Sequence, residues 1–346
     1  MQKQRNRRIV LASRPTGEPG VDNFNLVEAA VPEAGPNEML LRTVYLSLDP
    51  YMRGRMSDEA SYAPPVELGA VMDGRSVCVV IKSHLPEYKA GDIVVAGSGW
   101  QEYSISDGKD VQRVDQTAKP ISFALGVLGM PGFTAYAGLL NIGKPQRGET
   151  LVVAAASGAV GSVLGQIAKL KGCRVIGIAG SEEKCRFVKG DLGFDNCLNH
   201  RLPDFAKRLE TACPKGIDIY FEMVGGAVLL AVLPLLNKFA RIPVCGLIAH
   251  YNGSGMPDGA SDIPQLMRNI LVNRLSLQGF IYSDHLSQFS TFGIEMSDWL
   301  RTGRVKYRED ITDGLENAPR ELIGLLRGEN FGKKVIQVSE DPASEL

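Results

Sequence analysis

The sequence predicts an α/β protein in which a doubly wound parallel sheet accompanies a separate β domain. Three observations support this prediction. Short β-branched segments broken by Gly and Pro occupy the first 125 residues. From about residue 126 to 300, apolar strands alternate with amphipathic helices, and a turn with two glycines joins the first of these strands to its helix. Such alternation is typical of a parallel sheet with helices on both faces.

The sequence predicts a β domain in the first part of the chain. Residues 39–44, 76–81 and 92–96 are rich in β-branched side chains, and turn signals such as Gly91-Asp92 separate them. After residue 304 we predict a helix over 317–326 and a last strand over 333–338. We expect that strand to rejoin the first part, so that residues 1–125 and 302–346 form one β-barrel-type domain.

The second part, residues 126–301, reads as the α/β domain. Residues 150–154 form a wholly apolar strand, and apolar residues then recur with helical spacing between 159 and 171. Gly172 is a suitable helix stop. Further strands are predicted over 174–179, 217–221, 241–246 and 275–280.

Composition excludes several classes of function. The chain has 346 residues, enough for two domains, and its net charge of −1 gives no electrostatic footprint for nucleic acid or anionic lipid. No stretch approaches the ~20 apolar residues of a membrane span. The apolar run that follows the basic residues 3–8 is too short for a signal peptide. We expect a cytoplasmic protein with a solvated basic N-terminal tail and no nucleic-acid or membrane partner.

The turn after residues 150–154 is the first candidate functional feature. It reads Ala155-x-x-Gly158-x-x-Gly161, with Ala at the first glycine position of G-x-G-x-x-G. Glycines let backbone N–H groups approach a pyrophosphate at a helix N-terminus. Two glycines alone also fit an ordinary tight turn, but the apolar strand before them and the amphipathic helix after them favour a dinucleotide site.

The end of the next strand indicates which dinucleotide binds. NAD enzymes place an acid there for the ribose 2′-hydroxyl, whereas this chain has Gly180-Ser181, with Lys184 one turn later. We expect Ser181 to cap the following helix and Lys184 to pair with the 2′-phosphate of NADPH. Glu182 and Glu183 are interpreted as first-turn acids that favour the helix dipole. The alternative for Lys184 is an ordinary surface lysine.

The cysteines and histidines do not suggest a metal site. Six cysteines lie at positions 78, 173, 185, 197, 213 and 245 without a C-x-x-C pair, and four histidines lie at 84, 200, 250 and 285 without a matching cysteine pattern. Structural zinc ligands normally come in tight pairs. We expect buried free thiols rather than disulfides, and no bound metal.

Several stretches of the sequence resemble one family. They are LDPYMR at 48–53, GMPGFTAY at 129–136, the turn at 155–161 with residues 165–169, residues 179–181 and 244–246, and GENFG at 328–332. They resemble the medium-chain dehydrogenases/reductases, in the zinc-independent branch of leukotriene B4 dehydrogenases, prostaglandin reductases and double-bond reductases. Residues 126–129 and 311–319 resemble the bacterial curcumin/dihydrocurcumin reductases. The resemblance implies a GroES-like substrate domain, a Rossmann NADPH-binding domain and a homodimer.

The resemblance also implies which residues contact NADPH. Residues 159–162 lie under the pyrophosphate, Lys184 and His200 lie near the 2′-phosphate, and Asn330 touches the nicotinamide half. The full set of implied contacts is Thr134, Gly158, Ala159, Val160, Gly161, Ser162, Gly180, Ser181, Lys184, His200, Cys245, Gly246, Leu247, Ile248, Tyr251, Phe280, Ile281, Tyr282 and Asn330. Met223 stands where relatives carry Asn, so an amide contact to the cofactor is missing and its affinity is expected to be lower.

The implied reaction is NADPH-dependent reduction of the C=C bond of α,β-unsaturated ketones and aldehydes, curcumin-type enones included, by hydride transfer to the β-carbon. Tyr251 is expected to stabilise the enolate oxygen or pass on a proton, and Tyr51 to position the carbonyl or an aromatic substituent. A packed rim residue is the alternative for each tyrosine. Residues 56–65 and 252–264 are expected to shape the pocket, with Met256 a candidate lid residue.

Two other functions remain open at this point. A quinone oxidoreductase of the same superfamily shares the cofactor and the absence of zinc. An NADPH-binding protein with a regulatory rather than catalytic role is the second alternative.

Overall fold

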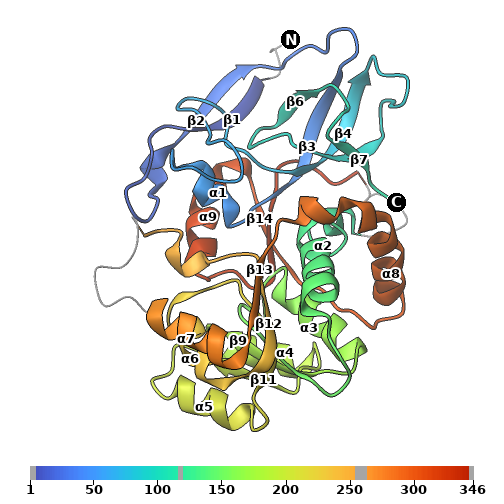
Figure 1. Ribbon diagram of the computed structural model, residues 1–346. Helices are drawn as coiled ribbons and strands as arrows, with labels where there is room; N and C mark the ends of the chain where they lie inside the picture. The colour runs from blue at the N-terminus through green and yellow to red at the C-terminus, as the bar shows by residue number, and fades with distance from the viewer. Residues whose placement is uncertain (1–4, 116–119, 254–262, 343–346) are drawn as a thin grey trace. The chain divides into compact units, whose positions relative to one another are not determined.

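The computed structural model describes residues 5–115, 120–253 and 263–342. The chain forms two compact units: residues 1–126 with 309–346, and residues 127–308 (Figure 1). One unit contains a six-stranded parallel sheet and the other a mainly antiparallel sheet. The predicted α/β class, with a doubly wound sheet and a separate β domain, is confirmed.

The first unit is built around a seven-stranded sheet in the order β14-β15-β3-β4-β5-β7, with β6 paired to β3. The last strand along the chain pairs antiparallel with β3, so the C-terminal segment completes this sheet. The elements of the unit are β1 (Arg5–Leu11), β2 (Phe24–Ala30), β3 (Met39–Ser47), α1 (Tyr51–Arg55), β4 (Ser76–Ser83), β5 (Ile93–Ala96), β6 (Tyr103–Ser106), β7 (Val111–Arg113), β14 (Glu309–Asp313), α9 (Ala318–Leu326) and β15 (Lys333–Gln337).

The expectation of a solvated N-terminal tail is wrong. Residues from Arg5 onward form β1, which pairs antiparallel with β2 along its whole length. The Asn6 amide is buried, donates to the Tyr103 carbonyl at 2.9 Å and accepts from the Tyr103 amide at 3.0 Å. The apolar residues that follow, Ile9 and Leu11, are buried and draw the basic residues before them into the strand.

The second unit contains the parallel sheet in the order β10-β9-β8-β11-β12-β13. Numbered along the chain, this is the strand order 3-2-1-4-5-6 of the Rossmann fold. Its elements are α2 (Met130–Ala137), β8 (Thr150–Val153), α3 (Gly161–Leu170), β9 (Arg174–Ala179), α4 (Glu182–Gly190), β10 (Asn196–Asn199), α5 (Phe205–Ala212), β11 (Ile217–Phe221), α6 (Gly226–Val232), β12 (Leu236–Val244), α7 (Ile263–Asn273), β13 (Ser276–Gly279) and α8 (Phe289–Arg301).

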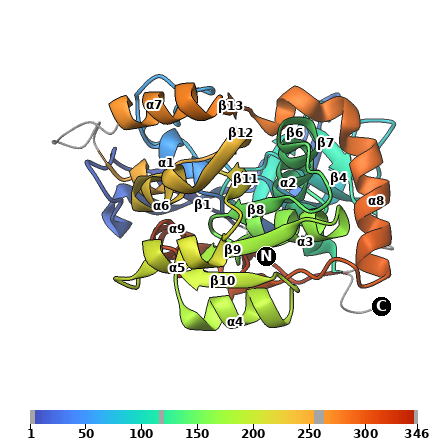
Figure 2. The same ribbon diagram turned by 60° about the horizontal axis from the view of Figure 1, so that its bottom comes forward.

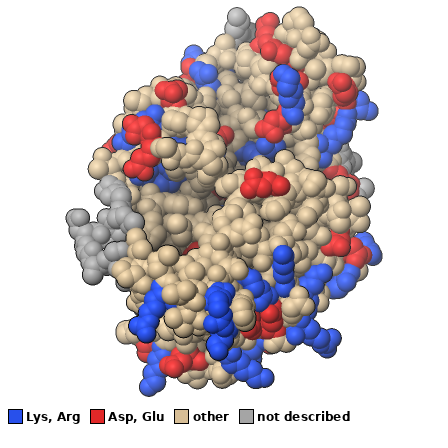
Figure 3. Space-filling model, viewed as in Figure 1, with Lys and Arg blue, Asp and Glu red and all other residues tan. Residues whose placement is uncertain are grey.

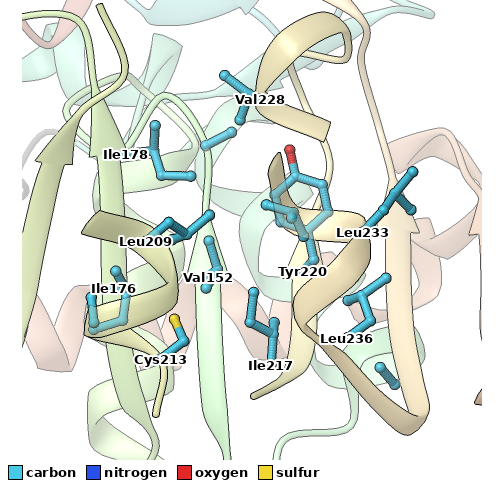
Figure 4. Packing of buried hydrophobic residues seen from close by; sticks show 14 of the residues in the cluster. Val152, Ile176, Ile178, Leu209, Cys213, Ile217, Tyr220, Val228, Leu233 and Leu236 are labelled. Carbon is cyan, nitrogen blue, oxygen red and sulfur yellow. The ribbon is translucent and has the colours of Figure 1, made fainter. Parts of the chain in front are cut away.

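Helices cover the sheet of the second unit. Helices α5 and α6 bury Leu209 and Val228 against Val152 and Ile217 of the strands, as Figure 4 shows. Helices α3 and α4 pack against β8, β9 and β10, next to which Figure 2 shows them. All six strands run parallel, so their carboxyl ends lie along one edge, where ligands bind in folds of this kind.

The surface agrees with the composition. On the face drawn in Figure 3, Lys and Arg side chains are interspersed with Asp and Glu, in line with the net charge of −1. None of the helices within the described ranges has the length and apolar character that crossing a membrane requires.

Candidate functional site

The glycine turn joins β8 to α3, as the sequence predicts. Ala155 has φ 48°, in the left-handed region that favours glycine, and the Ala156 amide donates to the Ile178 carbonyl of β9 at 2.9 Å. A Cβ atom added to Gly161 would lie 2.4 Å from the Ala155 carbonyl oxygen. The turn therefore depends on glycine at position 161, and it opens onto the N-terminus of a ten-residue helix, which favours an anion.

The ends of β9 and β10 bring basic side chains together. Ser181 caps α4 as predicted, because its hydroxyl accepts the Lys184 amide at 3.2 Å. A Cβ atom on Gly180 would lie 3.5 Å from His200 Nε2 and 3.5 Å from Arg201 Nε. The pKa of His200 is lowered by desolvation and by the positive charges of Arg201 and Lys184. Lys184, His200 and Arg201 therefore lie near Gly180-Ser181, the segment at the end of β9 where NAD enzymes carry an acid.

Arg201 is a candidate that the sequence interpretation missed. Its side chain lies as close to Gly180 as that of His200, on the loop that follows β10. The available signal was its position directly after His200, since the strand before it, β10, was not among the predicted strands. We include Arg201 with Lys184 and His200 in what we call the basic cluster.

The ends of β11 and β12 are tied to each other. Ile248 N–H donates to the Met223 carbonyl at 3.1 Å, and Ala249 N–H donates to the Val224 carbonyl at 3.0 Å. Residue 223 therefore shapes this loop through its backbone, whatever its side chain. The missing amide contact expected for Met223 stays a prediction.

The Glu222 side chain binds backbone amides of the same loop. The sequence interpretation did not identify this residue. Its Oε1 accepts the Val224 amide at 2.7 Å, the Gly225 amide at 2.8 Å and the Tyr220 hydroxyl at 3.2 Å. The carboxylate is buried, and burial raises its pKa. Among the described residues its Oε2 has no hydrogen-bond partner. An acid directly after the predicted strand over 217–221 was the available signal for it.

Tyr251 is folded back over the loop after β12. Its hydroxyl accepts the Leu247 amide at 3.3 Å, and a Cβ atom on Gly246 would lie 3.2 Å from that oxygen. A phenol that accepts one hydrogen bond can still donate its own proton. Burial raises the pKa of Tyr251, so the phenol stays protonated at neutral pH.

The remaining candidates of the second unit lie on α2 and after β13. Phe280 is buried and packs edge-on against Phe221. A Cβ atom added to Gly138 would lie 2.4 Å from Phe280 Cζ, so glycine at 138 makes room for this ring. Ile281 and Tyr282 follow it and are partly exposed. The Thr134 hydroxyl donates to the Met130 carbonyl of its own helix at 2.8 Å.

Tyr51 and Asn330 belong to the first unit. Tyr51 begins α1, and the Arg55 guanidinium lies 5.5 Å from its ring centroid and 5.3 Å from that of Tyr62. Burial raises the pKa of Tyr51, with Asp49 and Asp73 adding to the effect. The Asn330 side chain donates to the Gly332 carbonyl at 2.7 Å.

Part of the predicted pocket wall is outside the described residues. This applies to residues 254–262, which include Met256. Residues 56–65 are described and form the loop after α1. Arg55, the last residue of α1, donates to the Pro64 carbonyl of this loop at 3.3 Å.

The cysteine prediction is confirmed in part. All six cysteines are free, and five are buried, whereas Cys245 is only partly buried. Within the described ranges, no three His, Cys, Asp or Glu side chains are grouped so as to hold a metal ion. The absence of a bound metal stays a prediction.

The geometry of the second unit fits NADPH. At Gly161 the backbone packs so closely that any side chain would collide with it, and this close packing forms the tight turn that a pyrophosphate needs. The basic cluster lies at the end of the next strand, where a 2′-phosphate requires positive charge. The individual cofactor contacts named from the sequence stay predictions.

Comparison with known proteins agrees with this picture. Residues 7–114 match the family described as the N-terminal domain of oxidoreductase, and residues 159–299 match the family described as zinc-binding dehydrogenase. The chain is 58% identical to NADPH-dependent curcumin reductase of Escherichia coli over 98% of its length and 99% of that protein. It is 38% identical to the NADP(+)-dependent 2-alkenal reductase of Nicotiana tabacum over 97% of its length and 98% of that protein.

A solved structure shares the whole fold. The crystal structure of CurA from Vibrio vulnificus in complex with NADPH has a TM-score of 0.94, with 55% identity over 97% of this chain and 100% of the other. The chain is also 40% identical to prostaglandin reductase 1 of Sus scrofa over 93% of its length and 95% of that protein. The chain belongs to the medium-chain dehydrogenase/reductase family, in its branch of prostaglandin reductases and alkenal double-bond reductases. The predicted family, with its Rossmann and GroES-like parts, is confirmed.

Proposed function

We propose that the chain is an NADPH-dependent oxidoreductase that reduces the C=C bond of α,β-unsaturated ketones and aldehydes. The observation that carries the cofactor assignment is the basic cluster of Lys184, His200 and Arg201 around the acid-free end of β9. The relatives named as curcumin reductase and 2-alkenal reductase support the reaction. Curcumin-type diaryl enones are the substrates to test first.

The residues of the second unit hold the cofactor. The turn at residues 158–162 receives the pyrophosphate at the N-terminus of α3. The basic cluster receives the 2′-phosphate, for which Arg201 offers a guanidinium fork and Lys184 a point charge. The segments 245–251 and 280–282, with Thr134, are assigned to the rest of the cofactor. Asn330 stays the residue assigned to the nicotinamide half. When bound, NADPH supplies a hydride from its nicotinamide ring.

Tyr251 stabilises the charge that develops on the substrate. Hydride addition at the β-carbon leaves an enolate, whose oxygen needs a hydrogen-bond donor. The Tyr251 hydroxyl accepts from the Leu247 amide, which fixes the oxygen and leaves the phenolic proton for the substrate. The raised pKa of Tyr251 favours hydrogen-bond donation by a neutral phenol at pH 7.

Tyr51 is assigned to positioning the substrate. Its ring stacks with Arg55, whose guanidinium also forms an ion pair with Asp73, 3.4 Å from Nε to Oδ2. The guanidinium therefore holds the ring against the α1 turn. An aromatic ring held in this way suits an aryl substituent of a conjugated ketone.

The exposed edge of the parallel sheet supports a homodimer. All four residues of β13 are exposed at the end of the sheet, and α7, which precedes β13 in the chain and packs against β12, exposes Leu271 at 77% and Met267 at 57%. Two copies that pair β13 with β13 would cover this edge symmetrically. Sedimentation of the parent should give a dimer and Leu277→Lys a monomer. Equal masses would refute this arrangement. The cytoplasmic location stays a prediction from the sequence.

Steady-state assays separate the proposed reaction from its alternatives. NADPH oxidation is measured with curcumin, with a short alkenal and with a small quinone, and the product is identified by mass. We expect addition of two hydrogens to the enone and a much higher kcat/KM for enones than for the quinone. A preference for the quinone would identify a quinone oxidoreductase. NADPH binding without turnover of any substrate would identify a regulatory protein.

A further inference from the structure

The loop of residues 56–66, which follows α1, is closed at its base. Met56 and Val66 at its two ends are buried, whereas residues 58–62 at its tip are exposed. The Val66 amide donates to the Arg55 carbonyl at 2.8 Å. A compact loop of this length whose ends lie close together is an Ω-loop, a kind of loop that is frequently functional. We call its two ends the neck.

Arg14 bridges the neck from a different segment of the same unit. Its guanidinium donates from Nη1 to the Met56 carbonyl and from Nη2 to the Val66 carbonyl, each at 3.1 Å. A guanidinium holds its donors in a rigid planar fork, so the two carbonyls are kept at a fixed separation. Arg14 therefore fixes the two ends of the loop relative to each other.

The contact between the two segments is reciprocal. Arg14 belongs to residues 12–20, part of the connection between β1 and β2, whereas Arg53 belongs to α1. Arg53 is buried, and its Nη2 donates to the Gly17 carbonyl at 2.7 Å. Each segment thus supplies one arginine to backbone carbonyls of the other. The connection between β1 and β2 is therefore a firm base from which Arg14 acts on the neck.

The loop adjoins the residue assigned to positioning the substrate. The Arg55 guanidinium lies 5.3 Å from the ring centroid of Tyr62, which is in the exposed tip, and 5.5 Å from that of Tyr51. Arg55 also donates to the Pro64 carbonyl of the loop at 3.3 Å. Tyr62 is 62% exposed, so its ring has surface left for a ligand. The conformation of the loop thus decides where this second ring lies relative to Tyr51.

We propose that Arg14 is a specificity-determining positioning residue, which closes the neck and thereby holds Tyr62 near Tyr51 for enones with two aryl groups. A diaryl enone can place one aryl group against each ring. A short alkenal has no aryl group and gains little from the loop. Holding the loop in advance lowers the entropy that a long substrate loses on binding. The inference rests on the proposed enone reduction, because it concerns the choice among enones.

Hydrogen exchange followed by mass spectrometry tests the neck without any substrate. Arg14→Met removes the fork and keeps an unbranched side chain. Exchange in residues 57–66 should become faster in this variant, while β3 and β4 should exchange as in the parent. Arg320→Met is the control, because it removes an exposed arginine of α9 in the same unit. Equal exchange of the loop in Arg14→Met and in the parent would overturn the proposal.

Steady-state kinetics at saturating NADPH tests the specificity. Arg14→Met should raise the KM for curcumin roughly tenfold, the effect of losing one charge-assisted hydrogen bond, with a smaller change in kcat. Its KM and kcat for crotonaldehyde and its Kd for NADPH should change little. Arg320→Met should match the parent with both substrates. An unchanged KM for curcumin, a loss confined to kcat, or an equal loss with both substrates would overturn the proposal.

A second variant covers the case in which Arg14→Met does not fold. Arg14→Lys keeps the charge and the aliphatic stem but lacks the planar fork, so it should shift loop exchange and the KM for curcumin in the same direction. Values equal to those of the parent would assign Arg14 to folding and overturn the proposal. Failure of the parent to reduce either enone would instead refute the proposed function, while the exchange result still reports on the neck.

Discussion

Lys333 and Asp49 form an ion pair inside the first unit, 2.7 Å from Nζ to Oδ1, with side-chain exposures of 1% and 8%. Lys333 also donates to the Leu48 carbonyl at 2.7 Å, and Ser47 donates to the other oxygen of Asp49. The pair joins the last strand, β15, to the segment that leads into Tyr51. It therefore fixes the start of α1 from within the core.

Lys333→Met should destabilise the protein strongly. The substitution leaves the Asp49 carboxylate buried without its partner, which typically costs about 3–5 kcal/mol. Urea unfolding measures the change in the free energy of unfolding. Lys109→Met is the control, because Lys109 pairs with Asp107 at the exposed surface and should leave stability almost unchanged. Equal stability of Lys333→Met and the parent would show that the pair does not matter for folding.

Glu309 should make stability depend on pH. It accepts the Ser122 hydroxyl at 2.6 Å, and Lys333 and Tyr45 are the charged or titratable groups facing it. Burial raises its pKa to about 7 from its ordinary value near 4.5. The folded state thus holds the proton more tightly, and this stabilisation is complete below pH ~4.5 and lost as the pH rises through about 7.

Urea midpoints measured at pH 5 and pH 8 test this dependence. Stability of the parent should fall with rising pH by up to about 3 kcal/mol more than that of Glu309→Gln, at 1.36 kcal/mol per pKa unit. The difference between the two proteins isolates Glu309 from Glu222, whose pKa is also raised by burial. Parallel pH profiles would contradict the assignment.

Arg201→Ala and Lys184→Ala should each weaken NADPH binding and spare NADH. Loss of one charge-assisted hydrogen bond to the 2′-phosphate corresponds to roughly 10- to 100-fold in Kd. Fluorescence titration with both cofactors measures the ratio. Arg186→Ala removes the same charge from an exposed position on α4 and should change neither Kd. An unchanged NADPH Kd in both variants would remove the basis for the cofactor assignment.

Gly161→Ala should abolish tight cofactor binding. The added methyl group would lie 2.4 Å from the Ala155 carbonyl oxygen, so the turn must move away from the geometry that receives the pyrophosphate. Gly293→Ala in α8 is a matched control, because a methyl group there meets no atom within 4 Å and alanine favours a helix. Calorimetric titration that finds equal NADPH affinity in both variants would contradict the role of the turn.

The sequence predicted the regular part of this fold well. The strands over 174–179 and 217–221 agree with β9 and β11 residue for residue, because short segments rich in β-branched and aromatic residues between turn signals define them. β12 begins at Leu236 rather than at 241, since the polar residues Asn237 and Lys238 interrupt its apolar pattern. A local departure of this kind depends on pairing with β11, where the register shifts.

The parts of the site that could be predicted from the sequence are those that depend on residues close together in the chain. The glycine turn and the Ser181 cap depend on neighbouring residues, so their spacing in the sequence revealed both. The proximity of Arg201 to Gly180 and the Lys333–Asp49 pair depend on which segments lie side by side after folding. Residues 49 and 333 are separated by most of the chain, and no local periodicity relates them.

Tyr251→Phe tests the proposed donor. Removing a hydrogen-bond donor to an oxyanion typically slows the chemical step about 10²-fold or more. Stopped-flow measurement under single-turnover conditions reports the hydride-transfer rate, separately from NADPH binding. The ring is retained, so the Kd for NADPH should change little. An unchanged transfer rate would assign Tyr251 to packing.

The central claim is hydride transfer from NADPH to the β-carbon of an enone, and isotope transfer measures it most directly. NADPH deuterated at both C4 positions is incubated with the protein and an asymmetric enone, and the product is examined by NMR. The proposal predicts one deuterium at the β-carbon, a solvent-derived proton at the α-carbon and an intact carbonyl. Deuterium at the carbonyl carbon, or no transfer to carbon, would contradict it.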